Sequence, residues 1–140
     1  MSLPDKRIIR FIKKHHLLTL STSDGSVPYA ASCFYIYAEE TNTLYFASSP
    51  DTKHIMDALK QPLVAGTIAS ETLIIKRIRG VQFTGRLTEE YSEEVRKKYI
   101  KRFPVALFVP FRLWAIELHF IKMTDNRLGF GEKIIWGSLE

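Results

Sequence analysis

Hydrophobic residues recur along the chain at two different spacings, which predict a few helices among a larger number of strands. Ile8, Ile9, Phe11 and Ile12 recur at helical spacing and predict an amphipathic helix over residues 4–16. Short runs rich in β-branched and aromatic residues, bounded by turn residues, predict strands. We expect these strands over residues 17–23, 28–38, 43–49, 63–69, 73–87, 113–123 and 128–136.

Two more helices are predicted from the residues at their ends. One is expected over residues 52–60. It should end before Pro62, because the residue that precedes a proline avoids helical geometry. The other is expected from Thr88 to Phe103, with Thr88 as its N-cap. Glutamates lie near the positive end of this helix dipole and basic residues near the negative end. Its expected buried stripe is Tyr91, Val95 and Tyr99.

The strands differ in how many of their faces are apolar. The strand over residues 28–38 carries apolar or small side chains on both faces, which fits a barrel wall that a helix or a second subunit also covers. In the strand over residues 73–87, Val81, Phe83 and Leu87 are expected to face the core. In the strand over residues 113–123, the expected core side is Trp114, Ile116, Leu118 and Phe120.

The order of elements is helix, three strands, helix, two strands, helix, two strands. Mostly antiparallel strands with few helices predict a mainly β fold of the α+β class: a small antiparallel β-barrel of six to seven strands with flanking helices. The 140 residues, with 46% hydrophobic and 25% charged content, suit a single domain over residues 1–140.

The composition and charge of the chain limit its expected cellular location and the classes of partner that it can bind. No apolar run approaches the roughly 20 residues that span a bilayer, and the first residues do not resemble a signal peptide, so we expect a cytoplasmic protein without a membrane partner. The net charge is +5 and the sequence pI is about 9.4. The basic residues fall in separate runs without exposed aromatic neighbours, which disfavours nucleic-acid binding. An anionic small ligand suits this charge equally well.

Nucleophilic and metal chemistry have little support in the sequence. Cys33 is the single cysteine, so an internal disulfide is excluded, and it lies in an apolar strand where a thiol is usually inert packing. The four histidines, His15, His16, His54 and His119, lack the close spacing of a metal site. We therefore expect no metal centre.

The stretch from Ser48 to His54 gathers hydrogen-bond donors between a strand and a helix. Ser48, Ser49, Thr52, Lys53 and His54 all donate or can become donors. The first N–H groups of a helix have no intrahelical partner and lie at the positive end of its dipole, so this stretch suits a phosphate. An ordinary capped helix with a solvated lysine is the alternative interpretation.

Four stretches of the sequence resemble one known superfamily. The turn Ser48-x-x-x-Thr52-Lys53-His54 and the strand over residues 79–85 resemble the pyridoxamine 5'-phosphate oxidase-like FMN-binding split barrels. Residues 102–106 and 124–136 resemble the YhbP-like branch of that superfamily more closely. The resemblance covers nearly the whole chain and implies a split barrel that forms a homodimer and binds FMN at the dimer interface.

The resemblance also implies residue roles. Ser48, Thr52, Lys53 and His54 match the residues that hold the FMN phosphate and ribityl chain. The strand around Ser32 and Cys33 would run beside the isoalloxazine ring and meet its edge with backbone groups. Gln82 and Lys133 are the residues expected from the partner subunit. His54 stands where the family has a permanent cation, and a neutral imidazole weakens such a clamp.

The implied activity is that of a flavin-dependent oxidoreductase of unknown substrate. The C-terminal Trp-Arg-Leu segment of the oxidases is absent, so vitamin B6 oxidation is not expected. One alternative is a non-enzymatic module that carries flavin or another anionic ligand. A weaker alternative is a haem-handling barrel with His54 or His119 as a ligand.

Overall fold

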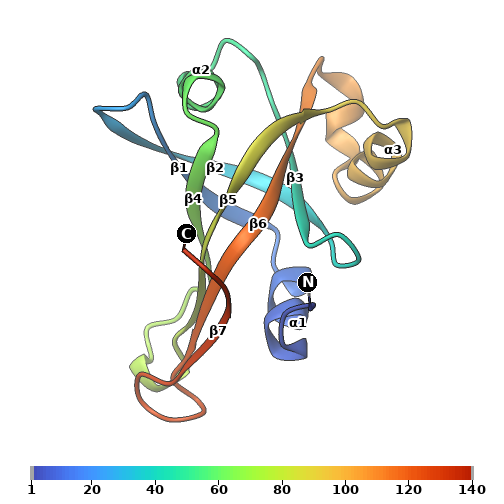
Figure 1. The fold of residues 1–140 in the computed structure, drawn as a ribbon. Helices are drawn as coiled ribbons and strands as arrows, with labels where there is room; N and C mark the ends of the chain where they lie inside the picture. The colour runs from blue at the N-terminus through green and yellow to red at the C-terminus, as the bar shows by residue number, and fades with distance from the viewer. Residues whose placement is uncertain (1, 140) are drawn as a thin grey trace.

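Seven antiparallel strands form one sheet that closes into a barrel, in a computed structural model that describes residues 2–139 (Figure 1). The strand order is β3-β2-β1-β4-β5-β6-β7, and a further pairing of β3 with β6 closes six of the strands. The antiparallel barrel with flanking helices confirms the predicted fold class. The strands are β1 (Leu17–Ser23), β2 (Pro28–Ala38), β3 (Thr43–Ser48), β4 (Leu63–Ala69), β5 (Arg79–Glu90), β6 (Arg112–Asp125) and β7 (Lys133–Gly137).

Three helices and two short 3-10 turns accompany the barrel. The helices are α1 (Lys6–Lys14), α2 (Lys53–Lys60) and α3 (Glu93–Arg102), and the turns are η1 (Ile75–Arg77) and η2 (Pro104–Phe108). The apolar sides of α1 and α2 belong to the main core, which includes Ile8, Ile12 and Ile55. The third helix contacts β2 and β3 from outside the barrel. Within residues 2–139, no helix is long and apolar enough to cross a bilayer.

The predicted strand over residues 73–87 is wrong in its first part. Residues 73–78 form a loop with η1, and β5 begins only at Arg79. The neighbouring strand β4 ends at Ala69, so this segment has no strand beside it. Asn126 fixes the loop instead, because its backbone N–H donates to Ile78 O at 2.9 Å and its side chain donates to Ile75 O at 3.0 Å.

The predicted start of the third helix is also wrong. Thr88 belongs to β5, where it pairs with Ala115 of β6. The helix begins at Glu93, and its N-cap is Ser92, whose side chain accepts from Val95 N. Tyr91, expected in the buried stripe, is exposed, whereas Tyr99 is buried as predicted. Strand pairing with β6 satisfies the backbone of residues 88–90, and this outweighs the local capping signal.

The core side of β6 changes at a bulge. Thr84 pairs with Phe120 and Gly85 with Leu118, so His119 is an extra residue in β6. One extra residue turns the following side chains to the opposite face. Ile121 is therefore buried, and Phe120, predicted for the core, is only half-buried. Gly85 permits the close approach, since a Cβ there would lie 2.4 Å from Glu117 O.

Candidate functional site

Three polar side chains meet where β3 leads into α2. His54 Nε2 lies 2.7 Å from Ser48 Oγ, and Ser48 Oγ lies 3.3 Å from Thr52 Oγ1. The indole N–H of Trp114 donates to Ser48 O at 2.9 Å and so fixes the end of β3. The structure therefore brings together Ser48, Thr52 and His54, three of the residues predicted for the phosphate. We call these three residues the seat.

The N-terminus of α2 keeps its hydrogen-bonding capacity. Thr52 occupies the N-cap position, but its side chain makes no capping bond and donates instead to Ser49 O at 2.7 Å. The first N–H groups of an α-helix have no intrahelical acceptor. Unlike Ser92, which caps α3, Thr52 leaves these groups to an external acceptor. An anion is the ligand that such groups favour.

Burial keeps the imidazole of His54 neutral. The side chain is half-buried, and desolvation lowers the pKa of His54 below its ordinary value, against a smaller opposing effect of Asp57. At neutral pH the imidazole therefore contributes one N–H donor and no charge. A permanent cation has to come from another residue.

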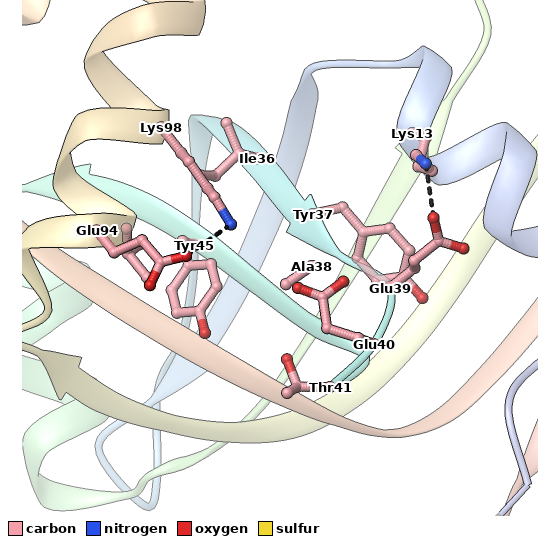
Figure 2. Close-up of a pocket in the computed structure, with 11 residues that line it drawn as sticks. Lys13, Ile36, Tyr37, Ala38, Glu39, Glu40, Thr41, Tyr45, Glu94 and Lys98 are labelled. Carbon is pink, nitrogen blue, oxygen red and sulfur yellow. Dashed lines mark hydrogen bonds and ion pairs between the residues drawn. The ribbon is translucent and has the colours of Figure 1, made fainter.

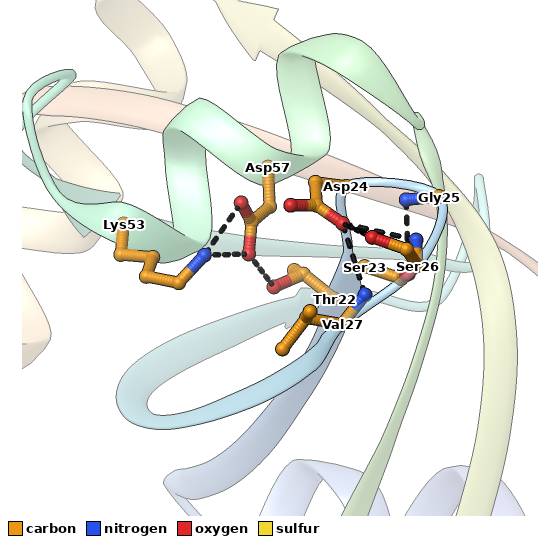
Figure 3. A network of polar contacts seen from close by, with 8 residues as sticks. All are labelled: Thr22, Ser23, Asp24, Gly25, Ser26, Val27, Lys53 and Asp57. Atoms are coloured by element: carbon orange, nitrogen blue, oxygen red, sulfur yellow. Dashed lines mark hydrogen bonds and ion pairs between the residues drawn. The ribbon is translucent and has the colours of Figure 1, made fainter.

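The ammonium of Lys53 contacts Asp57 rather than a residue of the seat. Its ammonium lies 3.0 and 3.1 Å from the two carboxylate oxygens of Asp57 and 5.3 Å from the centre of the Tyr29 ring. Asp57 is buried and also accepts a hydrogen bond from Thr22 at 3.4 Å (Figure 3). The Lys53–Asp57 pair thus ties α2 to the β1–β2 hairpin.

The turn of the same hairpin is fixed by Asp24. Its carboxylate accepts from the backbone N–H groups of Ser26 and Val27, each at 3.0 Å (Figure 3). These hydrogen bonds lower the pKa of Asp24 to about 2. The hairpin that Lys53 contacts is therefore preorganised at neutral pH.

Arg112 is a cation that the sequence did not reveal. It pairs directly with Ser48 across β3 and β6, and directly opposed residues of an antiparallel pair share one face with Cβ atoms about 5 Å apart. Its guanidinium is 3.8 Å from Glu89, and its side chain is 58% exposed. Arg112 lies far from Ser48 along the chain, so only the closure of the barrel places them together.

Beside the seat, β2 has an unpaired edge. Its pairing with β3 covers only Tyr35 to Ala38, whereas β1 pairs with it as far as Pro28. Tyr35 N–H donates to His16 O on the β1 side. Backbone groups alternate in direction along a strand, so those of Ser32 point to the unpaired edge and those of Cys33 point to β1. The barrel is thus split between β2 and β3, next to the seat.

Ser32 and Cys33 therefore differ in what they can offer a ligand. Ser32 is exposed on the outer face and has backbone groups at the split. The Cys33 thiol is buried, and this burial raises its pKa to about 12. Its backbone is used by β1, so Cys33 supports the strand rather than facing the split.

Gln82 and Lys133 lie away from the seat within one chain. The pairings Ser32–Thr19, Thr19–Thr67 and Thr67–Gln82 put Gln82 in the same row as Ser32 on the outer face. Three strand spacings separate them, which is roughly 14 Å. Lys133 starts β7, and its ammonium donates to Gly131 O at 3.0 Å. A single chain does not bring either residue to the seat.

A hollow of about 310 Å³ beside β2 and α3 offers a different chemistry (Figure 2). Each of its cations already has a carboxylate: Lys13 lies 2.7 Å from Glu39, and Lys98 lies 3.3 Å from Glu94. This balance of charge makes the hollow a poorer anion site than the seat. No cluster of three or more metal-ligating side chains occurs within residues 2–139.

Solved structures define the class to which this fold belongs. A putative pyridoxamine 5'-phosphate oxidase from Listeria innocua has a TM-score of 0.70 at 16% identity and covers 84% of this chain and 94% of its own. A haem-binding protein from Mycobacterium smegmatis has a TM-score of 0.75 at 13% identity over 98% of this chain and 60% of its own. With the split between β2 and β3, these similarities identify a split-barrel protein.

Sequence relatives identify the family. A UPF0306 protein of Photorhabdus laumondii is 40% identical over 132 residues, which is 92% of each chain. A UPF0306 protein of Yersinia pestis is 37% identical and covers 100% of this chain and 99% of its own. The chain belongs to the UPF0306 family. No family model matches the sequence.

Proposed function

We propose that this protein binds FMN, with the phosphate at the seat and the isoalloxazine ring along the unpaired edge of β2. We place the chain in the YhbP-like branch of the pyridoxamine 5'-phosphate oxidase-like superfamily. One observation carries the proposal: the donor-rich seat and the free backbone groups of Ser32 flank the same split. A ligand with an anionic end and a planar end that accepts and donates hydrogen bonds suits this arrangement.

In this proposal each group of the seat has a distinct role. The N–H groups at the start of α2 and the hydroxyls of Ser48 and Thr52 donate to phosphate oxygens. His54 adds a neutral donor. Arg112, opposite Ser48, supplies the permanent charge, while Lys53 stays paired with Asp57 of the same helix.

We further propose a homodimer that completes the site. The loop over residues 70–78 and the turn over residues 126–132, which we call the arm, are joined by the hydrogen bonds of Asn126. Leu73, Ile75 and Phe130 are exposed there, and Phe130 is 85% exposed. A second copy would cover these side chains. Lys133 lies at the base of the arm, which suits its expected role in the partner's site.

Bound flavin would supply the redox chemistry, and the protein would orient the ring and tune it. No side chain of the seat is assigned as an acid or base, since His54 is engaged with Ser48. The proposed activity is oxidoreduction of an unidentified substrate. A carrier that binds flavin without turnover would use the same residues.

One observation favours a haem-handling alternative. His119 lies at the β6 bulge, is half-exposed, and lines a hollow of about 530 Å³ together with Leu63, Val64 and Leu139. An imidazole beside apolar side chains suits a haem ligand. His54 suits this role less, because Ser48 holds its Nε2.

Spectra and titrations separate these functions. The purified protein is examined by absorbance and then titrated with FMN and with riboflavin while flavin fluorescence is recorded. We expect FMN to bind at least about tenfold more tightly, because riboflavin lacks the phosphate that the seat holds. A protein that takes up no FMN contradicts the proposal. Equal affinities for FMN and riboflavin contradict a phosphate site at the seat.

Two further measurements separate the alternatives. A Soret band with added haemin favours the haem-handling function. Bleaching of bound flavin by a nicotinamide donor distinguishes an oxidoreductase from a carrier.

A further inference from the structure

The segment between α3 and β6 forms an apolar projection on the surface. Val105, Leu107 and Phe108 in η2 are 74%, 65% and 82% exposed. Ala106 is buried in a small cluster with Tyr99 and Leu113, which fixes the turn to the barrel. An exposed apolar group of this size on a fixed turn marks an interaction site.

Cations surround this projection, and carboxylates are missing from its part of the sequence. Residues 95–116 contain six lysines and arginines and no aspartate or glutamate. Lys98 and Arg112 pair with glutamates outside this range. Lys97, Lys101 and Arg102 form no ion pair within residues 2–139. The last turn of α3, which leads into the projection, therefore carries the cations Lys101 and Arg102, while the glutamates of this helix lie in its first turn.

Two hollows meet beside the projection. A groove of about 440 Å³ has Ile36 and Tyr37 among its lining and four cations around them: Lys13, Lys98, Lys101 and Arg102. An apolar pocket of about 450 Å³ is lined by the rings of Phe34, Tyr99, Phe103 and Phe111 and by part of η2. Arg102 borders both hollows, so cationic and apolar contacts are available side by side.

We propose that this surface docks on an anionic lipid bilayer, which replaces the expectation of no membrane partner, since that expectation concerned only segments that span a bilayer. The docking face consists of Lys97, Lys101, Arg102, Val105, Leu107 and Phe108. The apolar side chains enter the boundary between headgroups and acyl chains, and the cations contact lipid phosphates. A bilayer covers an outward-pointing turn and neutralises the cations around it at the same time.

The charge argues against a second copy of the chain as the occupant. A two-fold contact through this face would bring the same residues of both copies together. Lysines and arginines would then face lysines and arginines, and like charges across an interface are costly. The arm proposed for the dimer lies at the other end of the molecule, away from α3 (Figure 1). The docking face contains no residue of the seat, although the apolar pocket beside it extends to Phe34 on β2 and to Ala47 next to Ser48.

Vesicle sedimentation tests the proposal with the full chain. The protein is mixed with vesicles of phosphatidylcholine alone or with about one third phosphatidylglycerol, and the bound fraction is measured. We expect binding to the anionic vesicles, little binding to the neutral ones, and weaker binding at high salt, because screening acts on the cations. A soluble short-chain phosphatidylglycerol serves as a competitor that presents the headgroup without a bilayer.

A matched pair of double variants locates the binding face. Lys101→Glu/Leu107→Ser removes one cation and one apolar side chain from the docking face. Leu59→Ser/Lys60→Glu makes the same chemical changes on α2, where Leu59 is 63% exposed. We expect the first variant to bind anionic vesicles at least about tenfold more weakly, and the second to bind like the unmodified protein.

Four outcomes overturn the proposal. One is the absence of binding to anionic vesicles, and another is an equal loss in both double variants. The third is full competition by the soluble short-chain lipid, which would indicate a pocket for single molecules. The mass of the lipid-free proteins is measured by sedimentation velocity, and a smaller mass for Lys101→Glu/Leu107→Ser would assign the face to contact between copies instead. Circular dichroism confirms that each variant is folded.

Discussion

Replacement of Arg112 by glutamine tests which cation holds the phosphate of the ligand. Arg112 opposes Ser48 in the β3–β6 register, so its guanidinium can reach an anion at the seat. A hydrogen bond to a charged group contributes about 1.5–3 kcal/mol. The Arg112 side chain is 58% exposed, and water screens exposed charges, so the lower end applies. Arg112→Gln should therefore weaken FMN binding by about 1.5 kcal/mol, roughly tenfold.

The FMN affinity of Lys53→Met is compared with that of Arg112→Gln, because Lys53 is the other cation near the start of α2. Lys53 would have to leave Asp57, which is only 4% exposed, before its ammonium could reach the phosphate. An unpaired buried carboxylate costs about as much as the new contact would contribute. We therefore expect less than about a threefold change in FMN affinity for Lys53→Met, together with a loss of about 1 kcal/mol in the free energy of unfolding.

Fluorescence titration with FMN measures these affinities, and urea denaturation measures the stabilities. Arg10→Gln on α1 removes the same charge from an exposed position and should leave the affinity unchanged. The reasoning is refuted if Arg112→Gln binds FMN normally while Lys53→Met loses tenfold. That result would mean that Lys53 leaves Asp57 for the phosphate.

Three further predictions concern stability. Gly66→Ala should lower the free energy of unfolding by about 3 kcal/mol in urea, because a Cβ there would lie 2.5 Å from the backbone oxygen of Thr19; an unchanged midpoint would contradict the close packing. Ser92→Ala should cost about 1 kcal/mol, whereas Thr88→Ala should cost less, since Ser92 caps α3; thermal denaturation of both variants checks which residue is the cap. The pKa of His54 is lowered in the folded state, so the unfolded state binds the proton more readily. Stability should therefore fall as the pH drops below about 6.5, and His54→Gln should reduce this fall in urea titrations at several pH values.

Much of the fold could be predicted from residues that are close in sequence. Runs rich in β-branched and aromatic residues, bounded by turn residues, predicted the bounds of β1, β2 and β4, since both signals depend only on neighbours along the chain. The start of α2 after a hydroxyl-rich turn was predicted for the same local reason. The grouping of Ser48, Thr52 and His54 follows from one short turn, so this part of the site was accessible to sequence reasoning.

Other features depend on contacts between distant segments. The β6 bulge at His119 lies opposite Gly85 of β5, where a Cβ would lie 2.4 Å from Glu117 O, and the alternation of β6 alone does not show it. Thr88 carries a sound capping signal, yet it pairs with β6 instead. The role of Lys53 at the phosphate stays a prediction, but the sequence did not show that its ammonium lies 3.0 Å from Asp57, because the burial of Asp57 is a property of the folded core.

The sequence by itself determined that this chain forms an antiparallel barrel with a donor-rich turn before its second helix, because both properties depend on periodicity and local chemistry. Tertiary structure decided where the barrel splits, which backbone edge of β2 stays free, and that Arg112 opposes Ser48. It also placed an apolar turn among unpaired cations beside α3. These features arise when strands distant in the sequence pair and close the barrel. The residue pattern of a single strand does not predict which strand will pair with it.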